Sequence, residues 1–232
     1  MERKGASGQN GAGRLSRTSV LKAALELVDE HGVEALSMRR LGQAIGRDPM
    51  SIYRYAANRQ ELLAGVAELV LDEVETFPDD THWQAQLRRM AHELRRVCLL
   101  HPNAVPLLVT GPLSTPLGLR PAGTLRPLEQ VLGTLIRAGF VPADALHIYR
   151  AFYGFLYGHI LNELQELIAD PDENEALLRL GLQRLPLRDF PHLRSLAPEL
   201  LEYDGSQELD EGLTILLAGL GHQLADNEAR YT

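Results

Sequence analysis

Apolar residues recur every three or four positions along most of this chain, and that spacing limits its fold more than any other feature. From Ser16 or Thr18 the apolar side chains keep this spacing as far as Gly32, which predicts an amphipathic helix that ends at the glycine. No segment shows the alternation of apolar and polar residues that is typical of a half-buried strand. The pattern therefore predicts an all-α protein.

Composition excludes several classes of protein. The 232 residues are 45% apolar and 23% charged, which is ordinary globular usage and unlike collagen or disordered chains. No apolar run approaches the roughly 20 residues that cross a bilayer, and the N-terminus has no signal peptide, so a soluble, cytoplasmic protein is expected. The single cysteine, Cys98, cannot form an intramolecular disulfide and is expected to be buried. The eight histidines form no close ligand pair, so no metal and no cofactor is expected.

Several further helices follow the first. Residues 1–13 are rich in glycine and polar residues and are expected to form a flexible tail. Residues 110–126 contain three prolines and are expected to form a loop-rich stretch. Helices are predicted at 58–77, where Phe77-Pro78 ends the helix, and at Trp83–Leu100, Ala104–Val109, Leu128–Ala138, Pro142–Ala169, Glu175–Leu182 and Leu209–Leu224.

The most specific local pattern lies between Ser37 and Tyr55. Ser37 is expected to cap a short helix that Gly46 breaks. Asp48-Pro49 then supplies a side-chain acceptor and a preset φ, which predicts a second short helix from Pro49 to about Tyr55. Two short helices around a glycine-containing turn are typical of the helix-turn-helix, whose second helix enters the DNA major groove.

Charge is divided unevenly along the chain. Residues 1–60 hold ten lysines and arginines against six acids, a net charge of +4, while the whole chain carries −8, which leaves −12 for the remainder. A basic module on an acidic body is consistent with binding of a polyanion by the N-terminal part.

The side chains of the second short helix suit contact with DNA. Ile52 is expected in the core, where it anchors the helix. Arg54 can bond guanine or a phosphate, Met50 can contact a thymine methyl, and Ser51 and Tyr53 can donate to phosphate. The alternative is that Tyr53 and Tyr55 are core aromatics and that the arginines form a solvated face.

Residues 14 to about 75 resemble the TetR/AcrR family of bacterial transcriptional regulators. The resemblance is carried by residues 39–55 (RRLGQAIGRDPMSIYRY), by Asn58-Arg59 and by the connection at residues 30–37 (EHGVEALS). It implies that Ser37, Arg39, Tyr53 and Arg59 touch DNA. The full set of expected DNA-contacting residues is Ser37, Arg39, Arg40, Arg47, Pro49, Met50, Ser51, Tyr53, Arg54, Tyr55 and Arg59. The family usually has Ser or Thr where Asp48 stands and a small residue where Met50 stands, so the operator sequence stays open.

The C-terminal half resembles the tetracycline-repressor branch of the family. The resemblance implies a two-fold homodimer through the Pro142–Gln165 and Leu209–Leu224 helices and an effector cavity within the same domain. Metal chelation of the effector is not expected, because the positions that would supply ligands are apolar. An apolar pocket with a few polar groups is expected to be lined by Trp83, His101, Leu107, Leu108, Tyr149, Phe152, Tyr153, Phe155 and His159. For each of these residues, the alternative is a position in the core or at the dimer interface.

Together these patterns divide the chain into a helix-turn-helix domain at 14–60 and a regulatory and dimerisation domain at 61–232, with residues 59–77 as the connecting helix. The predicted function is a homodimeric transcriptional regulator, a repressor that a small, largely apolar effector releases from a two-fold symmetric DNA operator. One alternative is a constitutive DNA-binding or adaptor protein without an effector. An enzyme is disfavoured because the sequence contains no glycine-rich phosphate loop and no nucleophile elbow.

Overall fold

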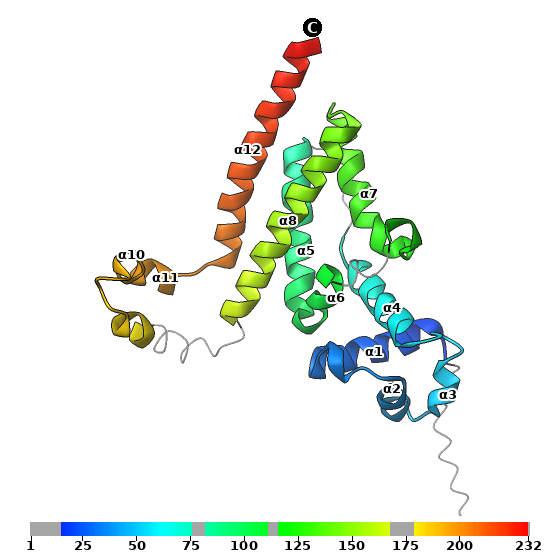
Figure 1. Cartoon of the computed structure of the whole chain (residues 1–232). Helices are drawn as coiled ribbons and strands as arrows, with labels where there is room; N and C mark the ends of the chain where they lie inside the picture. The colour runs from blue at the N-terminus through cyan, green and yellow to red at the C-terminus, as the bar shows by residue number, and fades with distance from the viewer. Residues whose placement is uncertain (1–14, 76–81, 111–115, 168–178, 232) are drawn as a thin grey trace, which may run out of the picture.

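The computed structural model describes residues 15–75, 82–110, 116–167 and 179–231, and regular structure in these ranges is entirely helical, which confirms the all-α prediction (Figure 1). A further helix runs through residues 179–184. The helices are α1 Arg17–His31, η1 Val33–Ala35, α2 Met38–Ala44, α3 Pro49–Ile52, α4 Arg59–Leu71, α5 Trp83–Leu100, η2 Pro102–Ala104, α6 Val105–Thr110, η4 Leu117–Leu119, α7 Ala122–Arg137, α8 Pro142–Leu167, α10 Pro191–Ser195, α11 Ala197–Leu201 and α12 Gly205–Tyr231.

Helices α1 to α3 form a small head, and α4 leads from it to the rest of the molecule (Figure 1). The first helix begins with a reciprocal capping box between Ser16 and Ser19 and ends at Gly32, whose φ of 78° favours glycine. Its apolar face, which includes Val20, Ala24 and Val28, is buried and packs against α4. The head therefore has a continuous core with α4 rather than a core of its own.

The two short helices of the head begin at the predicted caps. The Ser37 side chain accepts from the Arg40 amide at 3.1 Å, and the Asp48 side chain accepts from the Met50 amide at 2.8 Å. Between the helices, a Cβ added at Gly42 would lie 2.8 Å from the Arg47 carbonyl oxygen, so the turn approaches α2 closely there.

The second short helix is shorter than predicted. It covers four residues and continues as hydrogen-bonded turns, in which the Tyr55 and Ala56 amides donate to the Ile52 carbonyl.

The larger body contains α5, α7, α8 and α12, with α5 beside both α8 and α12 (Figure 1). Its core is apolar, and Trp83 packs edge-on against Phe140 with ring centroids 5.2 Å apart. Cys98 is buried as expected, and burial raises the pKa of its thiol to about 12. The body also contains an ion pair between Arg95 and Glu163, whose carboxylate is almost fully buried.

Several boundaries differ from the predictions. Helix α7 begins at Ala122, inside the predicted loop, and Pro127 lies within the helix and does not precede it. Helix α12 begins at Gly205 and ends at Tyr231, so it is longer than predicted at both ends. The predictions for residues 1–13, for Phe77-Pro78 and for the start of the 175–182 helix lie outside the described residues. In the described ranges, no helix has the length and apolar character that crossing a membrane requires.

Candidate functional site

The recognition segment, residues 37–56, presents four arginines to solvent. Arg39, Arg40, Arg47 and Arg54 are all exposed. Among the residues that the structure describes, none of these four side chains has a hydrogen-bond or ion-pair partner. Exposed cations that gather in one segment are suited to meet a polyanion.

Two large side chains of the recognition segment, Met50 of α3 and Tyr53 just after this helix, are also exposed. Met50 is 71% exposed and Tyr53 is 47% exposed, which is unusual for large apolar side chains. Ile52 in the same helix is fully buried, as predicted, and so is Leu41 in α2. The buried pair holds α3 against the head while Met50 and Tyr53 remain accessible.

Ser51 and Tyr55 are placed differently from what the sequence suggested. The Ser51 hydroxyl donates to the Asp48 carbonyl at 2.6 Å, so its proton is engaged within the turn. The half-buried Tyr55 donates to the Leu15 carbonyl at 2.8 Å and ties the end of the recognition segment to the start of α1. Both residues are half-buried, and Tyr55 packs against the core, so the alternative that it is a core aromatic is consistent with the structure. Contact of either residue with DNA stays a prediction.

Arg59 also donates hydrogen bonds within the head. Its Nε donates to the Leu36 carbonyl and one terminal nitrogen donates to the Val33 carbonyl, both at 2.8 Å. The same nitrogen lies 3.5 Å from a Glu34 oxygen. In this arrangement Arg59 braces the connection before α2 from the first turn of α4. Pro49 is half-buried at the first position of α3, where its ring sets the helix start.

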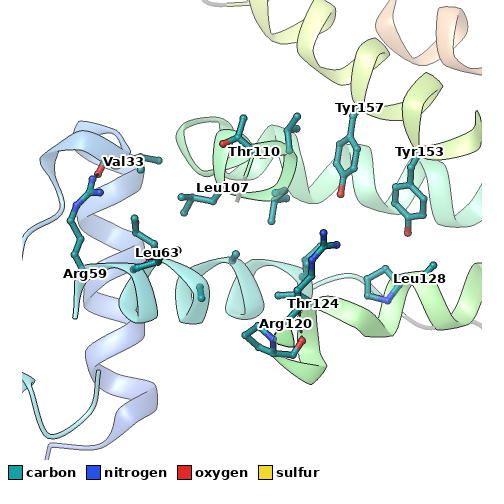
Figure 2. Close-up of a pocket in the computed structure, with 18 of the residues that line it drawn as sticks. Val33, Arg59, Leu63, Leu107, Thr110, Arg120, Thr124, Leu128, Tyr153 and Tyr157 are labelled. Carbon is teal, nitrogen blue, oxygen red and sulfur yellow. Dashed lines mark hydrogen bonds between the residues drawn. The ribbon is translucent and has the colours of Figure 1, made fainter. Parts of the chain in front are cut away.

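A cavity of about 420 Å³ lies between the head and the body (Figure 2). Helices α4 and α6 form two of its walls, and α7 and α8 close the end farthest from the head. Its lining residues are Val33, Glu34, Arg59, Gln60, Leu63, Ala64, Ala67, Leu71, Leu107, Leu108, Val109, Thr110, Arg120, Pro121, Thr124, Pro127, Leu128, Tyr149, Tyr153 and Tyr157. The volume lies within the range typical of sites for small molecules.

Four of the nine residues expected at a ligand pocket line this cavity: Leu107, Leu108, Tyr149 and Tyr153. The other five lie elsewhere. Trp83 packs against Phe140, and Phe152 is core. Phe155 stacks on His159, which lies beside Glu163. Trp83 therefore packs within the body at the start of α5. Phe152, Phe155 and His159 pack within the body on sides of α8 that face its other neighbours.

The fifth residue, His101, joins the head to the body. Its Nδ1 lies 2.8 Å from Asp29 of α1, and its Nε2 lies 3.1 Å from Glu73, just after α4. Burial by itself lowers the pKa of His101, but the hydrogen bonds and charges of the two carboxylates outweigh it, so the net pKa is raised. Asn103 adds a bond from its side-chain amide to the Asp29 carbonyl at 2.7 Å. His101 is therefore part of an interdomain contact.

Two further contacts connect α4 with α7 beside the cavity. The Glu68 carboxylate accepts from the Gly123 amide at 3.2 Å, and Arg126 pairs with Asp72 at 2.7 Å. A molecule in the cavity would thus touch α4 while α4 is attached to both the head and the body.

Sequence reasoning missed several residues of the cavity, of which Tyr157 and Arg120 are the most important. Tyr157 follows Tyr149 and Tyr153 at the same four-residue spacing, a signal that was available in the sequence. Arg120 falls in the stretch predicted as a loop, and no local pattern marks it. In the described part of the chain, no group of three or more His, Cys, Asp or Glu side chains is arranged to hold a metal ion.

Comparison with protein families matches both parts of the chain. Residues 20–66 match the family described as bacterial regulatory proteins, tetR family. Residues 77–224 match the family described as tetracyclin repressor-like, C-terminal domain. The first match covers the recognition segment, and the second covers most of the body.

Individual proteins resemble the chain over nearly its whole length. The class C tetracycline repressor of Escherichia coli is 29% identical over 89% of this chain and 91% of its own length. An HTH-type transcriptional regulator of Saccharopolyspora erythraea is 30% identical over 89% of this chain and 84% of its own. A crystal structure of ActR from Streptomyces coelicolor in complex with actinorhodin superposes with a TM-score of 0.75, at 27% identity over 91% of this chain and 99% of that one.

Proposed function

Because the chain belongs to the TetR family of bacterial transcriptional regulators, we propose that it is a homodimeric repressor that a small molecule in the cavity releases from its operator. It is a DNA-binding regulator, and members of this family are not enzymes. The observation that carries the proposal is the set of exposed arginines around α3, which have no partner in the part of the chain that the structure describes. We place its action in the cytoplasm, where its DNA target lies.

The proposed DNA contacts follow from exposure. Arg39, Arg40, Arg47, Arg54 and Tyr53 are assigned to the interface, together with Met50 as an apolar base contact. Ser37 and Pro49 lie beside this face, where the backbone of each helix start can approach a phosphate. Ser51, Tyr55 and Arg59 are assigned to support within the head because their donors already have protein partners.

A dimer through α8 and α12 is supported by the faces that these helices leave uncovered. Gly154 and Gly158 of α8 have no atom within 4 Å of an added Cβ, so a second helix has room to approach. Ile215 of α12 is 78% exposed. We propose that a second copy covers both faces and sets the two recognition segments one DNA turn apart.

Release is proposed to work through α4. The cavity is lined by Val33 and Arg59 on the head side and by body helices on the other. A ligand that fits one arrangement of head and body better than the other shifts the dimer away from the spacing that the operator needs. ActR, a relative with the same fold, has been crystallised with actinorhodin bound, which supports a small-molecule effector for this chain. The apolar walls of the cavity in this chain suit a largely apolar molecule.

The test is operator binding by a double variant, Arg54→Ala with Tyr53→Phe, in a mobility-shift titration at a stated salt concentration. The operator is first obtained by selection of bound oligonucleotides. We expect at least about a tenfold loss of affinity, since each good base or phosphate contact contributes roughly 1 to 3 kcal/mol. Arg188→Ala, at an exposed arginine outside the head, is the matched control. Unchanged affinity of the double variant would remove α3 from the proposed interface.

A constitutive regulator is the remaining alternative. A thermal-shift screen separates the two, because a ligand of the folded state raises the melting temperature. A screen in which every compound is silent, with operator binding intact, would favour the constitutive alternative.

A further inference from the structure

Three tyrosines form a ladder along one side of α8. Tyr149, Tyr153 and Tyr157 are spaced four residues apart, and their ring centroids are separated by 4.9 Å and 5.5 Å in turn. All three line the cavity. Figure 2 shows the hydroxyl oxygens of Tyr153 and Tyr157 at the ends of side chains that extend from α8 toward α4 and α7. The ladder therefore presents hydroxyl groups to the end of the cavity farthest from the head.

The phenol groups of the ladder are available as hydrogen-bond donors. Among the described residues, none of the three hydroxyls has a hydrogen-bond partner. Burial raises the pKa of all three phenols, and for Tyr149 it does so against the opposing charges of Arg120 and Arg150, so each keeps its proton at neutral pH. A phenol proton that meets no acceptor in an apolar space costs free energy, and an acceptor on a ligand removes that cost.

The two threonines of the lining behave differently from the tyrosines. Thr110 donates to the Pro106 carbonyl at 2.7 Å, and Thr124 donates to the Pro121 carbonyl at 2.8 Å. Their hydroxyl protons are therefore engaged, and the phenols are the hydroxyl donors left to a ligand.

The charged side chains of the lining interact within the protein. Glu34 and Arg59 lie 3.5 Å apart at the head end of the cavity, where Gln60 is exposed. Arg120 has an interaction of its own within the protein, so its charge is not assigned to a ligand. At the end of the cavity formed by α7 and α8, the polar groups assigned to a ligand are therefore the phenols.

We infer that the cavity selects a largely apolar molecule whose polar groups are hydrogen-bond acceptors such as ring carbonyls, and that the phenols of α8 make this selection. Each carbonyl at the ladder accepts from a phenol, while the apolar walls from α4 and α6 cover the rest of the molecule. The inference names the chemical class of the proposed effector and rests on the proposed function for its regulatory meaning. Molecules with donors in place of acceptors, or with no polar group, are the competing classes.

The test compares three probes that share one flat tricyclic frame and differ at the bridging group. The probe 9-fluorenone carries a carbonyl acceptor, carbazole carries an N–H donor, and fluorene carries neither. Their dissociation constants for the full-length protein are measured by equilibrium dialysis. The readout is the ratio of the fluorene constant to the fluorenone constant, because the different hydration of the two probes in water enters this ratio equally in every variant.

A triple variant removes the hydroxyls and keeps the rings: Tyr149→Phe, Tyr153→Phe and Tyr157→Phe in one protein. We expect the ratio to fall about fivefold through weaker binding of fluorenone, which is the size of one net hydrogen bond between neutral groups. The dissociation constants of fluorene and carbazole should change by less than about twofold, because neither probe offers the phenols an acceptor.

Two control variants keep the ladder. Thr124→Val removes a hydroxyl of the same cavity whose proton is engaged, and Tyr203→Phe makes the matched change at an exposed tyrosine outside the lining. Both should leave the ratio within about twofold of the wild-type value.

The outcomes are decisive in both directions. A ratio that the triple variant leaves unchanged would overturn the inference, and so would the absence of fluorenone binding to the wild type. A loss of carbazole affinity with an unchanged ratio would mean that the phenols accept rather than donate. A fall in Thr124→Val as large as in the triple variant would contradict selection by the phenols.

Operator binding is measured on the same preparation without probe. If the operator binds normally while the ratio does not respond to the triple variant, the ligand class is wrong and the proposed regulator stands. If the ratio responds as expected and the operator does not bind, the ligand class stands and the proposed regulator is wrong.

Discussion

The recognition segment and the cavity both contain polar side chains that have no partner among the described residues, but their surroundings differ. Arg39 and Arg54 extend into solvent, where water solvates their charge in the unbound state. Tyr153 and Tyr157 line a cavity of about 420 Å³. Exposed cations attract a polyanion over a distance and hold it through many weak contacts. Donors that line a cavity act only on a molecule small enough to enter it, so the proposed DNA contact depends on charge and the proposed effector site depends on shape and hydrogen-bonding pattern.

The two regions are also held in different ways. The head is braced by side chains that donate to backbone carbonyls, as Arg59 does to Leu36 and Tyr55 does to Leu15. The body behind the cavity contains an ion pair with a buried carboxylate, Arg95–Glu163. Bonds to carbonyls fix the direction of a chain segment, whereas a buried ion pair must remain intact because either charge alone is strongly destabilising. The predictions below test this division.

The largest expected effect is in the body. Replacement of Arg95 by Met should lower the free energy of unfolding by about 3 to 4 kcal/mol, because it leaves the buried Glu163 carboxylate without its cation. Urea denaturation followed by circular dichroism measures the loss. Arg126→Met breaks an exposed pair with Asp72 and should cost less than about 1 kcal/mol. Equal losses in the two variants would contradict the distinction between buried and exposed pairs.

Sequence patterns predict the head well because its geometry depends on neighbours in the chain. Ser37 and Asp48 cap helices two or three residues ahead, and such bonds follow from residue type and spacing. The roles of Tyr55 and Arg59 were not predictable in this way, since their partners Leu15 and Leu36 are far away in sequence. A matching motif could not show that these two side chains donate to backbone carbonyls of the head.

The cavity was predictable only in part for the same reason. Tyr149 and Tyr153 were identified from their helix, and Tyr157 continues the same spacing. Arg120 lies between η4 and α7, in the stretch that was predicted as a loop, and no local pattern marks its place at the cavity. Which apolar or aromatic side of α8 faces a cavity, and which faces core, depends on packing among α4, α6 and α7, and no local pattern in one sequence records that packing.

The second prediction concerns the brace at Arg59. Arg59→Met keeps the side-chain stem but removes the bonds to Val33 and Leu36, so the head should lose about 2 kcal/mol of stability. Amide hydrogen exchange in α1 to α4 measures this loss directly.

Salt dependence separates a brace from a phosphate contact. Operator affinity of Arg59→Met is expected to fall while the slope of log affinity against log salt stays unchanged, because no counterion release is lost. If the Arg39 side chain contacts a phosphate, Arg39→Met should leave the free energy of unfolding unchanged and reduce the salt-dependence slope by about 1 per contact. A reduced slope for Arg59→Met would return that residue to the DNA interface.

A smaller effect is expected for the two tyrosines of the recognition segment, which differ only in where their hydroxyls point. Tyr55→Phe removes a bond to the Leu15 carbonyl and should destabilise the head by about 1 kcal/mol. Tyr53→Phe removes an exposed hydroxyl that has no partner among the described residues, so stability should change by less than about 0.5 kcal/mol while operator affinity falls. Thermal unfolding and mobility shifts on both variants test the pair, and a stability loss at Tyr53 with none at Tyr55 would reverse the assignment.

The smallest effect lies at the contact between head and body. His101 is faced by Asp29 from α1 and by Glu73 after α4, and Arg96 of α5 donates to the Glu73 carbonyl. Because the pKa of His101 is raised in the folded protein, its stabilising contribution is fully present below its unfolded value of about 6.5 and is lost as pH rises through the folded value.

The difference in unfolding free energy between the wild type and His101→Gln should therefore be largest near pH 5.5 and shrink toward pH 9. His192→Gln, at an exposed histidine of α10, should show no such trend. A difference for His101→Gln that stays constant across this range would mean that His101 joins the two parts as a neutral hydrogen-bonding group, and the contact between head and body would then not depend on its charge.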